Sequence, residues 1–184
     1  RGTPGAANPE CPLVLQPGEC GDNGVAGNIA NPIVGDLIIT EVMADPAAVG
    51  DTAGEWFEVY VAAEVDLNGL QAGTAFGTPS LMVTQADCLT VPAGTYVVFA
   101  RNTTMGSNGG LPVDSIGYTF NLANDPGSLF IGVNGVLLDE VAWTNSPTGA
   151  SLQLEPSEFN VALNDALTVV ACDGTTVYGA GDAG

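Results

Sequence analysis

The stretch DLIITEVMADPAAVGDTAGEWFEVYV, residues 36–61, decides the fold of this chain. In its first part, DLIITEV, Leu37 and Ile39 alternate with Ile38 and Thr40 in a β-branched run that favours a buried strand. Its last part, EWFEVYV, alternates in the same way and predicts a second strand. The loop between them is punctuated by Pro and Gly, which break both strands and helices.

Further strand candidates continue to the end of the chain, and no stretch shows a convincing helical period. A chain of many short strands separated by turns predicts an all-β, immunoglobulin-like antiparallel β-sandwich. The candidates are LMVTQ (81–85), TYVVFAR (95–101), SIGYTFN (115–121), SLFIGV (128–133), VLLDEVAWT (136–144), SLQLE (151–155), LTVVACD (167–173) and TTVYG (175–179).

Two dipeptides predict tight hairpins. Asn134-Gly135 separates SLFIGV from VLLDEVAW, and Asp173-Gly174 separates LTVVAC from TTVY. Both pairs are typical of type I′ turns, because these residues tolerate a positive φ.

Residues 1–35 differ in composition from the rest of the chain, because they are rich in Gly, Pro, Ala and Asn. Only PLVLQ, residues 12–16, has the composition of a short strand. We therefore expect an extended N-terminal arm over residues 1–35 and a β-sandwich domain over residues 36–184.

The charge of the chain excludes several classes of function. Asp and Glu number 21, against two Lys or Arg residues and no His, for a formal net charge of −19. Binding to nucleic acid or to an anionic membrane needs cations, so both are unexpected. Histidine-based catalysis and histidine metal sites are excluded, and nucleophilic catalysis lacks a His or Lys base. We therefore expect that this protein is not an enzyme.

The chain has four cysteines, Cys11, Cys20, Cys88 and Cys172, with no CxxC spacing. They predict two disulfides, and hence an extracellular or cell-surface protein. Three pairings are possible, of which Cys11–Cys20 with Cys88–Cys172 is the preferred one. No signal peptide is visible, so the sequence is interpreted as a mature or processed form.

Five acidic residues cluster around the loop that follows the first strand, namely Glu41, Asp45, Asp51, Glu55 and Glu58. Asp45, Asp51 and Glu55 are candidate calcium ligands, because Ca²⁺ binds carboxylate and carbonyl oxygens. A solvated acidic loop explains the same residues. Two carboxylate pairs, Glu55 with Glu58 and Asp139 with Glu140, are poor candidates for hydrolysis, because strand alternation directs the members of each pair to opposite faces.

Several segments occur in an order that resembles the lamin-tail domain in its bacterial secreted form. They are IITEVMADP, GEWFEVYV, VDLNGLQ, VPAGTYVVFAR, FNLANDPGSLFIGVNGVLLDEVAWT and GASLQLEP, within about residues 36–156. The resemblance implies an immunoglobulin-like sandwich that serves as an extracellular or structural interaction module, without a catalytic centre.

The two ends of the chain resemble halves of one closing motif of that family. The sequence ends in YGAGDAG and begins with RGTPGAANPEC. One period of a tandem array, or a subunit that donates its N-terminal arm to a neighbour, would account for this. An arm folded back onto its own domain is the simpler alternative.

We therefore expect a homopolymer, assembled head to tail as an extracellular filament or array. The alternative is a calcium-assisted or carbohydrate-directed binding module of a larger surface protein. In the filament, the arm would dock beside the C-terminal strands by strand addition. The arm residues are Arg1, Thr3, Pro4, Leu13, Val14 and Leu15, and the acceptor residues are Val169, Val177 and Tyr178.

Overall fold

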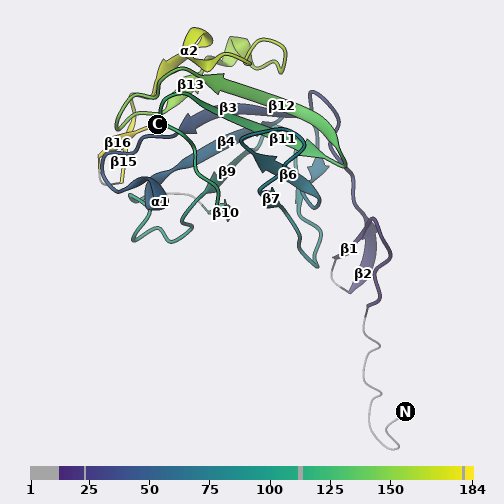
Figure 1. Ribbon diagram of the computed structural model, residues 1–184. Helices are drawn as coiled ribbons and strands as arrows, with labels where there is room; N and C mark the ends of the chain where they lie inside the picture. The colour runs from purple at the N-terminus through teal and green to yellow at the C-terminus, as the bar shows by residue number, and fades with distance from the viewer. Residues whose placement is uncertain (1–12, 23, 112–113, 180) are drawn as a thin grey trace, which may run out of the picture.

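The computed structural model describes residues 13–22, 24–111, 114–179 and 181–184. Within these residues the chain forms an all-β sandwich, as the strand pattern predicted (Figure 1). A six-stranded sheet in the order β10-β9-β4-β3-β13-β14 packs against a four-stranded sheet in the order β12-β11-β6-β7. Pairing is antiparallel throughout both sheets except between β9 and β10, which are parallel.

Residues 36–61 form the centre of the larger sheet, since they contain the paired strands β3 and β4. The strands of this sheet are β3 (Leu37–Met43), β4 (Trp56–Val61), β9 (Tyr96–Ala100), β10 (Ser115–Gly117), β13 (Leu152–Leu154) and β14 (Ala171–Asp173). The strands of the smaller sheet are β6 (Leu70–Gly73), β7 (Leu81–Met82), β11 (Gly127–Val133) and β12 (Val136–Trp143).

Three two-stranded ribbons and three short helices complete the described fold. The ribbons are β1 (Glu19–Asp22) with β2 (Val25–Asn28), β5 (Val65–Asp66) with β8 (Thr90–Val91), and β15 (Val177–Tyr178) with β16 (Asp182–Ala183). The helices are α1 (Asp51–Gly54), the 3-10 helix η1 (Pro156–Glu158) and α2 (Leu167–Val170).

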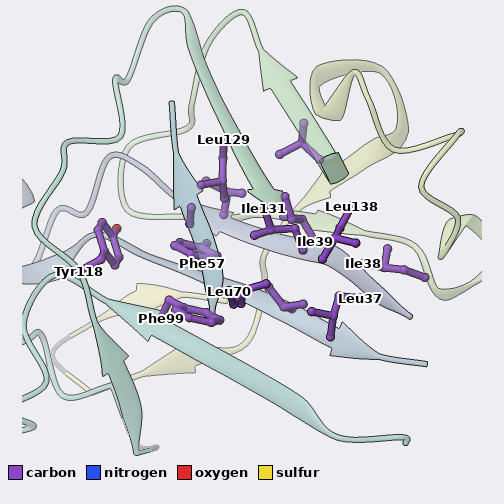
Figure 2. Packing of buried hydrophobic residues seen from close by; sticks show 14 of the residues in the cluster. Leu37, Ile38, Ile39, Phe57, Leu70, Phe99, Tyr118, Leu129, Ile131 and Leu138 are labelled. Atoms are coloured by element: carbon purple, nitrogen blue, oxygen red, sulfur yellow. The ribbon is translucent and has the colours of Figure 1, made fainter. Parts of the chain in front are cut away.

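The core lies between the two sheets, and aromatic rings fill one part of it (Figure 2). Phe57 and Phe99 are stacked on neighbouring strands with their ring centroids 4.7 Å apart. Tyr118 packs against Phe57 at 5.4 Å. From the smaller sheet, Leu70 and Ile131 are fully buried in the same cluster.

A bulge in β3 changes the side-chain alternation that the sequence predicts. Ile39 pairs with Val59, whereas Glu41 pairs with Glu58, so Thr40 is the extra residue. After this point Val42 belongs to the main core and Met43 to a separate cluster on the other face of the sheet. Glu41 therefore leaves the inward row that begins with Leu37 and Ile39, because one extra residue reverses the facing of all that follow.

One predicted hairpin is confirmed and the other is wrong. Asn134 and Gly135 have φ values of 50° and 77° between the paired strands β11 and β12, as a type I′ turn requires. The predicted strand at residues 167–173 is instead the helix α2 followed by β14. No hairpin forms at Asp173-Gly174, because β14 pairs with β13 and β15 pairs with β16.

The expected extended arm is also corrected in part. Residues 19–22 and 25–28 form the β1–β2 hairpin, and the described part of PLVLQ, residues 13–16, contains no strand. The hairpin projects from one end of the sandwich, whereas α1, β15 and β16 lie at the opposite end (Figure 1).

Candidate functional site

The β1–β2 hairpin is fixed to its own domain by a disulfide. Cys20 and Cys88 are bonded, with their Cα atoms 4.8 Å apart. The preferred pairing of Cys11 with Cys20 and Cys88 with Cys172 is therefore wrong. Cys172 is an exposed free thiol, and Cys11 lies outside the described residues. Cys172 donates a hydrogen bond to Glu155, and this bond and the charge of Glu155 raise the pKa of the thiol.

Main-chain hydrogen bonds reinforce this attachment. The Gly21 N–H donates to Ala86 at 2.8 Å, and the Cys88 N–H donates back to Gly21 at 2.8 Å. Further along, the Asp66 N–H donates to Ala30 at 2.9 Å. Residues 19–22 and 24–30 are therefore part of the folded domain.

The predicted arm residues lie partly within the described structure. Val14 is 73% exposed, Leu13 is 42% exposed and Leu15 is half-buried. Arg1, Thr3 and Pro4 lie outside the described residues. Near the hairpin, Val25, Ile33 and Val34 are also more than half exposed, although they were not predicted as contact residues. We call Val14, Val25, Ile33 and Val34 the arm end.

The predicted acceptor residues lie on α2 and β15. Val169 is 82% exposed on α2 rather than on a strand, and Val177 is 68% exposed on β15. Tyr178 is half-buried, and its hydroxyl accepts a hydrogen bond of 2.7 Å from the Trp56 indole N–H. Tyr178 is thus engaged within its own domain, and we call Val169 and Val177 the acceptor end.

Asp182, in the C-terminal stretch that resembles a closing motif, fastens the C-terminal residues to the sandwich. The Asp182 carboxylate is 1% exposed and accepts hydrogen bonds from the Ala47 and Ala48 N–H groups at 2.9 and 3.0 Å. The following Ala183 donates to Gly149 and accepts from Ser151. Sequence resemblance singled out this motif, but its anchoring role depends on contacts over more than 130 positions.

The candidate calcium ligands are not brought together. Asp45 accepts a hydrogen bond from Thr148, while Asp51 opens the short helix α1. Glu55 is buried, and its Oε2 accepts from Leu122 N and lies 3.0 Å from Arg101. Burial raises the pKa of Glu55 to about 7, although both of these partners act in the other direction.

Among the described residues, one group places three potential ligands within 4.8 Å of one another, and it consists of Cys20, Asp66 and Cys88. Its two sulfur atoms are committed to the disulfide. The Asp66 carboxylate accepts hydrogen bonds from Asn68 N and Leu89 N. With the disulfide formed, these three residues help to hold the hairpin on the domain and are not free to bind a metal ion.

A groove of about 250 Å³ lies on the face of the larger sheet that points away from the sandwich core. Glu41 and Glu58 face each other there on β3 and β4, and the groove is also lined by Thr40, Tyr96, Gln153, Leu154, Pro156 and Phe159. The sequence places Glu41 and Glu58 in one acidic cluster but does not predict this groove, because strict alternation places Glu41 on the inner face. The bulge at Thr40 is what brings the two carboxylates together.

Comparison of the chain with protein-family models, with curated proteins and with solved structures finds no match. In the part of the chain that the structure describes, no helix is long and apolar enough to cross a membrane.

Proposed function

We propose that this protein is an extracellular structural protein whose copies associate head to tail into a filament or array. The observation that carries the proposal is the arrangement of its exposed aliphatic residues. Val25 of the arm end is on β2, which projects from one end of the sandwich, and Val177 of the acceptor end is on β15, which lies at the opposite end (Figure 1). Val14, Ile33 and Val34 flank the hairpin in the sequence, and Val169 is on α2.

Two different patches at opposite ends suit a heterologous contact, in which the arm end of one copy meets the acceptor end of the next. Such contacts repeat in one direction and generate open filaments or arrays. The chain has only two cationic side chains, so copies of it have few ion pairs to form with one another. Burial of apolar patches needs no opposite charge and can hold such copies together. The buried Cys20–Cys88 disulfide is compatible with an extracellular location.

The proposal differs from the sequence-based expectation in the length of the arm. The hairpin and residues up to Ala30 are bonded to their own domain, so the donated segment is residues 1–16. The residues of the hairpin would then contribute side-chain contacts rather than an added strand.

A complementation experiment tests this function. One variant carries Val169→Asp and Val177→Asp and retains only the arm end. A second carries Val25→Asp and Ile33→Asp, which place charges in the arm end, and keeps the acceptor end intact. Met82→Asp, at a 57% exposed position on β7, is the matched control. Each species is followed by sedimentation velocity and electron microscopy over a concentration series.

We expect the wild type and the Met82→Asp control to form filaments and each end variant to remain monomeric. An equimolar mixture of the two end variants should form dimers and stop there, because one intact interface remains. Monomeric wild type at every concentration would contradict the proposal. So would variants that assemble like the wild type, or two end variants that do not combine.

A further inference from the structure

The outer face of the larger sheet is covered at two places and open between them. Towards the acceptor end, Trp56 and Met43 are buried in a cluster against which Tyr178 packs. Towards the other end, Phe159 packs on Tyr60 and Tyr96 with ring centroids 5.3 and 6.4 Å apart. The groove with Glu41 and Glu58 lies between these two covers.

Each carboxylate in the groove is held by a hydroxyl group through one oxygen only. Thr40 donates to Oε1 of Glu58 at 2.8 Å, and Ser151 donates to Oε1 of Glu41. Within the described residues, no donor reaches the Oε2 atom of either carboxylate. Glu41 is only 7% exposed, so it is a buried, oriented carboxylate with an open acceptor facing the groove.

The described structure supplies no cation to this pair. Like charges directly opposite each other on neighbouring strands destabilise a sheet. Burial, together with the charge of Glu58, raises the pKa of Glu41 to about 7, although the hydrogen bond from Ser151 acts in the other direction. The chain has two cationic side chains, and that of Arg101 is paired with Glu55.

The geometry favours a guanidinium group over other cations. A guanidinium is flat, carries five N–H donors and stacks on aromatic rings. Two carboxylate oxygens from adjacent strands match its donors, and two aromatic residues, Tyr96 and Phe159, also line the groove. Calcium would need six to eight oxygen ligands. A neutral sugar would leave the paired charges uncompensated.

The groove adjoins the proposed acceptor end, which indicates where the cation comes from. A Cβ atom on Gly184, which follows β16, would lie 3.0 Å from Glu41 Oε1, so the C-terminal segment lies against Glu41, one of the residues that line the groove. If a neighbour's Val14 contacts the acceptor end, residues 1–13 can extend up to about 45 Å beyond it. Arg1 lies within this segment.

We propose that the groove between Glu41 and Glu58 receives the guanidinium group of Arg1 from a neighbouring copy. This inference rests on the proposed head-to-tail assembly. It makes the groove a specificity site, since it accepts an arm that carries an arginine side chain and rejects the same arm without one.

The two end variants described above allow the inference to be tested separately from the proposed function. The copy with Val169→Asp and Val177→Asp donates its arm, and the copy with Val25→Asp and Ile33→Asp receives it. Arg1→Ala is placed in either the donating or the receiving copy. Glu41→Gln with Glu58→Gln is likewise placed in either copy, and Glu140→Gln, at an exposed position on β12, is the matched control.

We expect the heterodimer dissociation constant to rise by about 10-fold or more when Arg1→Ala is in the donating copy, or when the Glu variants are in the receiving copy. The reverse placements and the Glu140→Gln control should leave the constant unchanged.

If the parent variants do not dimerise, the proposed function fails. If they dimerise and Arg1→Ala in the donating copy has no effect, the assembly stands and this inference is overturned. An effect confined to Arg1→Ala in the receiving copy would show an arm bound within its own chain, and would also overturn it.

A peptide tests the chemistry directly on the acceptor-competent copy. The probe is the N-acetylated peptide of residues 1–12, and its control carries citrulline, a neutral isostere of arginine, at position 1. We expect shifts of the Thr40, Glu41 and Gln153 amide signals in NMR spectra with the arginine peptide alone. Equal shifts with both peptides, or with neither, would overturn the assignment of the groove to a guanidinium group.

Discussion

At the scale of single residues, Asp139 shows how a buried carboxylate holds an irregular strand. Its Oδ2 accepts hydrogen bonds from Ile39 N at 2.7 Å and from Asn164 Nδ2 at 2.8 Å. Asn164 also donates to the Ile39 carbonyl at 3.1 Å. Ile39 directly precedes the bulge at Thr40, so Asp139 and Asn164 satisfy both main-chain groups of this residue.

Replacing Asp139 tests this role. Asp139→Ala should lower the free energy of unfolding by about 2–4 kcal/mol, because it leaves the buried Ile39 N–H without its acceptor and removes one of the two acceptors of the Asn164 amide. Asp139→Asn retains one acceptor oxygen and should cost about 1 kcal/mol or less at pH 8. Urea unfolding measures both, with the exposed neighbour Glu140→Ala as control. Equal stability of Asp139→Ala and wild type would contradict this assignment.

At the scale of elements, the β1–β2 hairpin depends on its attachment. Its residues are mostly exposed apart from Cys20 and Gly21, so the hairpin has little core of its own. Gly21 lies close to the main chain of Ala86, where an added Cβ would be 3.3 Å from the carbonyl oxygen. The disulfide and a few hydrogen bonds therefore provide most of what keeps the hairpin on the sandwich.

Reduction of Cys20–Cys88 should release the hairpin without unfolding the sandwich. In hydrogen exchange, the amides of residues 19–30 should lose protection in the Cys20→Ser, Cys88→Ser variant, whereas those of β3 and β4 should keep it. Cys172→Ser, at the free thiol, is the matched control and should leave both segments unchanged. Retained protection of residues 19–30 would show that the hydrogen bonds alone suffice.

The C-terminal segment is the second element that depends on one anchor. In Asp182→Ala, the Ala47 and Ala48 N–H groups lose their carboxylate acceptor, and β16 loses its link to the loop after β3. We expect a loss of about 2–3 kcal/mol in unfolding free energy and a changed Trp fluorescence, because Trp56 bonds Tyr178 on the paired strand β15. The test fails if stability and fluorescence both match Asp45→Ala, a partly exposed carboxylate in the same loop.

The two dipeptide turns show how far sequence could predict these elements. Asn134-Gly135 lies between strands that pair with each other, so local turn chemistry and long-range pairing agree. Gly174 instead donates to Ser151, and an added Cβ there would lie 2.5 Å from the Ser151 hydroxyl oxygen. Gly174 is needed because the main chain passes close to Ser151, just before β13. This contact joins residues distant in the sequence, so a local turn signal does not predict it.

The candidate site was hidden for a related reason. Strand alternation correctly separated Asp139, which is buried, from Glu140, which is exposed. It failed for Glu41, because a bulge is a property of two paired strands and has no fixed signature in one of them. The apolar run LTVV at α2 was equally ambiguous, since a short run of this kind suits a strand or a buried helix.

At the scale of the whole molecule, buried carboxylates link stability to pH. Burial raises the pKa values of Glu41, Glu55 and Asp139 to about 7, and it also raises the pKa of Glu58. The charged groups nearest to them are the Glu41–Glu58 pair itself, Arg101 and Asp51 beside Glu55, and Asp165 beside Asp139. The folded state thus binds more protons than the unfolded state between about pH 4.5 and pH 7.

The protein should therefore be more stable in mild acid than in mild base. The stabilisation is fully present below the pKa of the unfolded carboxylates, near 4, and is lost as the pH rises through about 7. We expect the melting temperature at pH 5 to exceed that at pH 8 by several degrees, since a chain of this size gains roughly 2–4 °C per kcal/mol. The difference should persist at 0.5 M salt, because desolvation of buried groups, unlike repulsion among exposed charges, is weakly screened. The Glu41→Gln, Asp139→Asn double variant should show a smaller difference, whereas Glu140→Gln should not. A melting temperature that rises from pH 5 to pH 8 would contradict this account.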